Sequence, residues 1–151
     1  MPASNLFSRL LMLAAMPAAL GFASGSPNVV WQGLVKSKAL CNFDGNICWE
    51  GMVKAKALCN IRGNTVWEGM TQSRALFNMS NDVAWEGMVR AKALFCMQGD
   101  TVWEGQVRSK ALANFSGNQV WRGMVRASAV ANSSQRLDPM QRAVVVYLFA
   151  R

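Results

Sequence analysis

The sequence predicts an all-β repeat protein, and three observations support this prediction. Tryptophan recurs every 18 residues, and a glycine follows each tryptophan two positions later. Charged side chains within the repeat fall on one parity of positions, which is typical of strands with one buried face. Gly-Asn pairs, which favour tight turns, recur at the same place in the repeat, at 45–46, 63–64 and 117–118. The predicted core ladder consists of Trp31, Trp49, Trp67, Trp85, Trp103 and Trp121.

Composition limits the classes of protein to which the chain can belong. The 151 residues suffice for one domain with a modest core. Hydrophobic residues make up 52% and charged residues 16%, which argues against disorder. The net charge of +8 favours anionic partners. The absence of histidine removes the usual general base and the commonest metal ligand.

The chain divides into three segments: 1–28, the repeats at 29–136, and 137–151. Arg9 is the only charge before Lys36, and residues 10–23 are apolar or glycine apart from Pro17. This pattern fits a signal peptide, an organellar presequence, or a retained segment that anchors or docks the protein. The first segment therefore suggests export, organelle targeting or membrane association. The apolar segment 137–151 is expected to cap the repeats or to dock on a partner.

A helical repeat is the weaker alternative. With tryptophan as position 0, the cations at positions 5 and 7 would lie on opposite sides of a helix, and a glycine would interrupt every first turn. In a strand, by contrast, all even positions share one face. We therefore expect even positions, including tryptophan, to face inward, and odd positions, including position 17, to face outward.

Two β architectures fit the repeat. A β-solenoid with one coil per repeat needs a single turn signal, and Gly-Asn is the only strong one in each repeat. The alternative is a twisted meander with one hairpin per repeat. Cys41 and Cys59 at position 10 discriminate between them, because their Cα atoms would stack ~4.8 Å apart in a solenoid and lie ~9.6 Å apart in hairpins. Cys48 and Cys96 are expected on the outer face, unpaired.

Cations form the best candidate binding feature. Stacked repeats would place positions 5 and 7 in two columns on one face, where they could bind anionic membrane, acidic polysaccharide or nucleic acid. Nucleic acid is the less favoured ligand, since the tryptophans are expected inside. The candidate anion-binding residues are Lys36, Lys38, Lys54, Lys56, Arg74, Arg90, Lys92, Arg108, Lys110 and Arg126.

Apolar residues also recur at odd positions, as Met or Leu at position 3 and Leu at position 9. Exposed apolar columns indicate an interface. We therefore expect a non-catalytic structural or scaffold subunit that self-assembles or binds other protein subunits. The alternative is a module for anionic surfaces. No catalytic constellation, cofactor motif or metal-ligand spacing is present, so neither an enzyme nor a cofactor nor a bound metal is expected.

The repeats carry two family resemblances. The segment Gly63–Gly69, read as G-N-T-V-W-E-G, resembles the D-G-x-x-Y-x-G core of MORN repeats, although MORN units are longer and carry an Asn-Gly turn. The short coil and the inward alternation are similar to bactofilins. Both resemblances cover residues 29–136. They imply a scaffold or a polymer.

Overall fold

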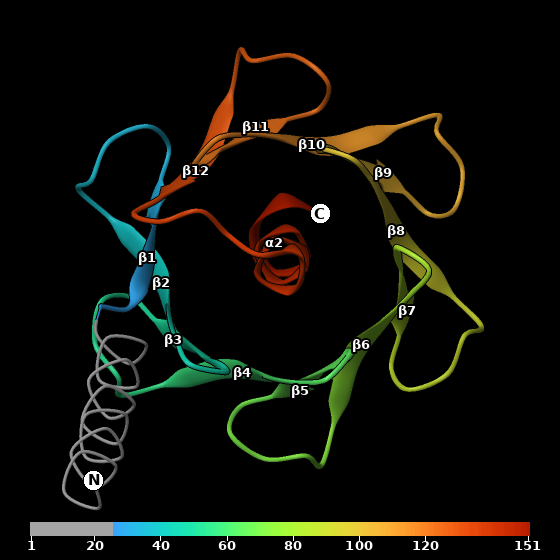
Figure 1. The fold of residues 1–151 in the computed structure, drawn as a ribbon, viewed down its shortest axis with the longest axis horizontal. Helices are drawn as coiled ribbons and strands as arrows, with labels where there is room; N and C mark the ends of the chain where they lie inside the picture. Colours follow the sequence, from blue (N-terminus) through green and yellow to red (C-terminus); the bar gives the residue numbers. More distant parts are fainter. Residues whose placement is uncertain (1–25) are drawn as a thin grey trace, which may run out of the picture.

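The computed structural model describes residues 26–151, and the predicted N-terminal segment lies almost wholly outside them. Twelve antiparallel strands form a closed barrel around a C-terminal helix (Figure 1). Each strand pairs with its neighbours in sequence, and β1 closes the ring by pairing with β12. The all-β repeat prediction is confirmed. The strands are β1 (Asn28–Gln32), β2 (Ala39–Asp44), β3 (Ile47–Glu50), β4 (Ala57–Arg62), β5 (Thr65–Glu68), β6 (Ala75–Ser80), β7 (Val83–Glu86), β8 (Ala93–Gln98), β9 (Thr101–Glu104), β10 (Ala111–Ser116), β11 (Gln119–Arg122) and β12 (Ala129–Ser133).

The predicted solenoid is wrong, because each repeat adds two antiparallel strands rather than one coil. Cys41 lies on β2 and Cys59 on β4, with β3 between them. The second connection is easy to miss in the sequence because it is not a tight turn. It is a six-residue loop, such as 51–56, that opens with a glycine in the left-handed region; Gly51 has a φ of 68°.

Two-residue turns close the opposite end of each hairpin. Asp44 pairs with Ile47, so Gly45 and Asn46 form the turn, and the φ of Gly45 is 61°. A positive φ at the first central residue alone is the type II′ arrangement, which matches the twist of the flanking strands.

The same turns change which positions of the repeat, even or odd, face the barrel interior. A two-residue turn pairs residues an odd number apart, so even positions face inward on one strand of the hairpin and odd positions on the next. Position 17 is therefore inward, contrary to expectation: Cys48 and Val66 are fully buried. Position 0 is outward. The six tryptophans are half-buried on the outer face and do not form the inward ladder expected of them.

The C-terminal segment fills the barrel, where α2 (Pro139–Val145) continues into the π-helical turn η1 (Val146–Ala150) (Figure 1). Asp138 starts α2 with a capping box: its carboxylate accepts from the Gln141 amide, and the Gln141 side chain accepts from the Asp138 amide. Val144, Val145 and Val146 are fully buried. We call residues 137–151 the plug.

The plug explains why one interior position varies between repeats. Position 10 reads Cys41, Cys59, Phe77, Phe95, Ala113 and Ala131, all fully buried. Contacts join η1 to β10, which carries Ala113, whereas Phe77 lies against Tyr147 with ring centroids 4.9 Å apart. A single helix cannot fill a six-repeat barrel symmetrically. Small residues leave room on one side and large residues fill the other.

Candidate interaction surface

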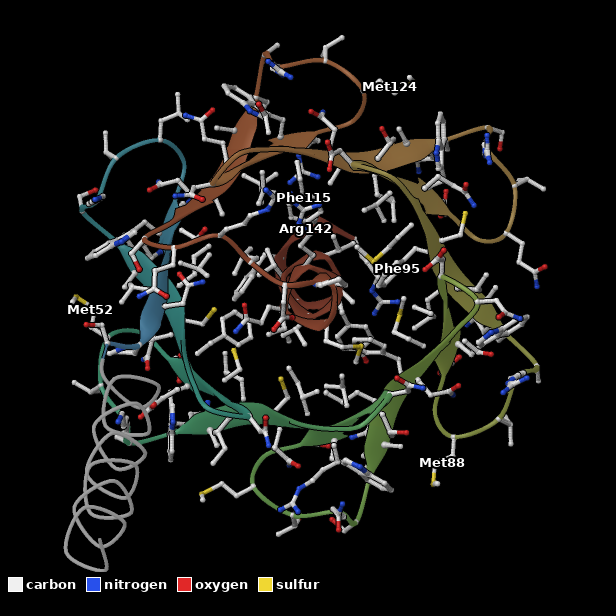
Figure 2. The ribbon with its side chains drawn as sticks, viewed as in Figure 1. Met52, Met88, Phe95, Phe115, Met124 and Arg142 are labelled. Atoms are coloured by element: carbon white, nitrogen blue, oxygen red, sulfur yellow. The ribbon has the colours of Figure 1, made fainter. Side chains whose placement is uncertain are left out.

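Six outer loops extend outward around the barrel (Figure 1). These outer loops are residues 33–38, 51–56, 69–74, 87–92, 105–110 and 123–128. Each combines exposed apolar side chains with cations. The exposed large apolar side chains are Leu34, Val35, Met52, Val53, Met70, Met88, Val89, Val107, Met124 and Val125, and their exposed fractions range from 53% at Leu34 to 65% at Met88. Figure 2 shows Met52, Met88 and Met124 pointing away from the ring.

Asparagine side chains at position 11 hold five of these loops against the barrel. Asn60 is typical: its Nδ2 donates to the Gly69 carbonyl at 2.8 Å and to the Thr71 carbonyl at 3.0 Å. Asn132 does the same across the ring closure, donating to Gly33 and Val35. The loop at 105–110 is different, because Cys96 stands at position 11. The other loop-holding asparagines are Asn42, Asn78 and Asn114.

All ten predicted anion-binding cations lie in the outer loops and are exposed. They do not form the expected stacked columns, because the loops are spread around the barrel. Position 7 pairs with the glutamate that precedes its loop in four repeats, as in Lys92–Glu86 at 3.4 Å and Arg74–Glu68 at 3.1 Å. The other two such pairs are Lys56–Glu50 and Lys110–Glu104.

Position 5 contacts the end of a neighbouring strand. Lys54 pairs with Asp44, and Arg108 donates to the Gln98 side chain at 2.6 Å. Most of the positive charge on loops 51–56, 69–74, 87–92 and 105–110 is thus matched by a nearby acid. Such exposed pairs contribute little to stability, but they reduce the net charge of that side of the ring.

Ring closure creates a surface that the linear sequence does not reveal. The first and last outer loops become neighbours because β12 lies between β11 and β1. Gln32 and Arg122 stand where the other four repeats carry glutamate. We call loops 33–38 and 123–128, with Gln32 and Arg122, the closure sector. Its cations are Lys36, Lys38, Arg122 and Arg126, and none of them forms an ion pair with a described residue.

Three thiols line up inside the barrel on β2, β3 and β4. Cys41, Cys48 and Cys59 are fully buried and free, and Cys48 pairs directly with Cys59 across the strands. The hydrogen bond to Cys41 raises the pKa of Cys48, as does burial, against a lowering by Cys59. The pKa of Cys59 is raised by its hydrogen bond to Cys48 and by burial. The raised pKa values keep Cys48 and Cys59 protonated and unreactive in the folded protein. Among residues 26–151, no three His, Cys, Asp or Glu side chains form a group suited to a metal ion.

A cavity of about 830 Å³ opens where the plug enters the barrel, at the end that carries the tight turns. Its wall includes Asp82, Asp138, Arg90 and Arg136. The Asp138 carboxylate already caps α2, so the wall offers no free pair of carboxylates for acid–base chemistry.

Reasoning from the sequence missed Arg142, which anchors the plug, and the asparagines that hold the loops. In Figure 2, Arg142 and Phe115 lie together inside the ring. Two signals could have revealed them: a lone arginine before a run of apolar residues, and a polar residue repeated at one position inside a strand.

The predicted MORN and bactofilin resemblances stay predictions. Neither helix in the described part of the chain has the length and hydropathy that crossing a bilayer requires. No family model, no curated protein and no solved structure matches the chain.

Proposed function

We propose that the protein is a non-catalytic structural subunit that associates with copies of itself or with other proteins through its outer loops. The observation that carries this proposal is the ring of exposed apolar side chains on loops that the barrel holds in place. Apolar surface repeated on several sides of one molecule favours contacts with several neighbours. The C-terminal segment fills the barrel, so the loops rather than this segment make the contacts.

Size-exclusion chromatography with light scattering, over a wide range of protein concentrations, tests the proposal. The wild type should have a mass at least twice the 16.5 kDa of one chain, or should recover protein partners in a pull-down. A variant with Met52→Ser, Met88→Ser and Met124→Ser should lose that association, because it removes exposed apolar surface from three separate loops. Replacing the same residues by leucine is the matched control. A wild type that stays monomeric and recovers no partner contradicts the proposal.

A second function is a module that binds anionic surfaces. The net charge of +8, with every candidate cation exposed on the loops, favours it. Binding that weakens steeply with added salt would support this second function. Binding that does not respond to salt would count against it.

A further inference from the structure

We propose that the closure sector docks the barrel on an anionic lipid bilayer. This inference rests on the second function above and names both the surface and the partner. Aspartate and glutamate are absent from residues 26–43 and from 105–137. The other outer loops sit beside Asp44 or a glutamate at position 1. The closure sector is therefore the side of the ring where cations have no neighbouring counter-charge.

Apolar side chains beside these cations identify the partner as a bilayer. Leu34 and Val35 in the first loop are 53% and 62% exposed, and Met124 and Val125 in the last are both 64% exposed. A bilayer offers an anionic surface above an apolar layer, so it can accept both kinds of side chain at once. Single-stranded nucleic acid stacks on well-exposed aromatic rings, whereas the six outer-face tryptophans are half-buried and no aromatic residue is among the exposed large apolar residues of the described chain.

The shape of the ring limits how many loops can reach one plane. In Figure 1 the six loops point outward around the ring, so a flat membrane that meets the ring from the side can contact only neighbouring loops. The two loops of the closure sector are such neighbours, because only β12 and β1 separate them.

Vesicle sedimentation of the full-length chain tests the proposal. Phosphatidylserine–phosphatidylcholine vesicles should bind the protein more tightly than phosphatidylcholine vesicles, and salt should weaken the binding. Replacing Lys36, Lys38, Arg122 and Arg126 with alanine should reduce partitioning by about six-hundredfold, since each of the four cations near the surface contributes about fivefold.

The matched control replaces Lys54, Lys56, Arg90 and Lys92 with alanine, which changes the net charge equally on two other loops. It should reduce partitioning much less. A second pair tests insertion: Leu34→Ser with Met124→Ser should weaken binding more than Met52→Ser with Met88→Ser. Circular dichroism of each variant verifies that the barrel is folded.

Each other result overturns the proposal in a distinguishable way. Equal losses in the two charge variants would leave a general anionic-surface function standing but reject the closure sector. Equal binding to neutral vesicles would reject the electrostatic contribution. A wild type that ignores anionic vesicles but binds single-stranded oligonucleotide would reject the bilayer as partner. Failure to bind any anionic probe would reject the second function as well.

Discussion

Arg142 on the plug donates from Nη1 to Oδ1 of Asp100, 3.1 Å away, and so ties the C-terminal helix to the turn between β8 and β9. The arginine side chain is only 11% exposed, and its guanidinium lies 4.7 Å from the centre of the Phe115 ring. One side chain thus contacts an acid at the rim and an aromatic ring in the core. This contact orients a helix whose other interactions are largely apolar and non-directional.

The first prediction concerns this contact. Arg142→Ala should lower the free energy of unfolding by about 2 kcal/mol, because it removes a charge-assisted hydrogen bond and a cation–π contact. Asp100→Ala should cost less, since the Asp100 side chain is 68% exposed and Arg142 keeps its contact with the Phe115 ring. Urea unfolding measures both. Arg126→Ala, on an exposed loop, is the control and should be near neutral; an equal cost there would contradict the anchoring role.

The second prediction concerns the loop without an asparagine. Cys96→Asn should stabilise the barrel by about 1 kcal/mol, because the new amide can donate to the carbonyls of Gly105 and Val107 as its equivalents do in the other repeats. Asn60→Ala should destabilise by about 1–3 kcal/mol for the same reason. Thermal unfolding and hydrogen exchange of the loop amides check both variants. If the amides of loop 105–110 exchange as fast in Cys96→Asn as in the wild type, an asparagine at position 11 does not hold the loop.

The third prediction concerns the plug as core. Val145→Asp should destabilise by about 4 kcal/mol or more, since it places a carboxylate without a partner at a fully buried site. A chain that ends at Arg136 should lose near-ultraviolet circular dichroism and bind a hydrophobic dye, because the barrel interior is left unfilled. Removal of Arg151 alone is the control. A truncated chain with native spectra would show that the barrel folds without its plug.

The fourth prediction concerns the buried thiols. A hydrogen bond to a neighbouring thiol, together with burial, raises the folded pKa of Cys48 and of Cys59, so both stay protonated at pH values where the unfolded chain ionises them. Their stabilising contribution is complete below the unfolded pKa, near 9, and is lost as the pH rises above it. Stability should fall by about 1.4 kcal/mol per pH unit for each thiol. Urea unfolding between neutral and alkaline pH measures this slope.

A variant with Cys48→Val and Cys59→Val should lose that part of the slope. If the slope is the same with and without the two thiols, other groups are responsible. Alkylation of the native protein should likewise be slow at Cys41, Cys48 and Cys59, because all three are fully buried.

The sequence by itself determined the repeat, the β class and, through the Gly-Asn pairs, three of the five tight turns. A period of 18 residues, the alternation of charge and the Gly-Asn pairs are local features, and local backbone preferences suffice to interpret them. They also identified ten cations at positions 5 and 7 of the repeats, but not the way in which the loops spread these cations around the ring. These local features could not show whether the even or the odd positions of each strand face the barrel interior. That parity depends on whether a connection pairs residues an odd or an even number apart, as Asp44 and Ile47 show.

Only the tertiary structure decided that the sixth repeat pairs with the first and that the C-terminal segment enters the ring. Both depend on contacts between residues that are distant in sequence, such as Val30 with Ser133 and Arg142 with Asp100. Closure removes the exposed strand edges that an open sheet would leave, and it creates a wide interior that must be filled. The same closure brings Lys38 and Arg122 into one sector although 84 residues separate them in the sequence. Local preferences carry no information about which distant residues become neighbours. That depends on closure of the ring, which is stabilised by the core that all six repeats bury together.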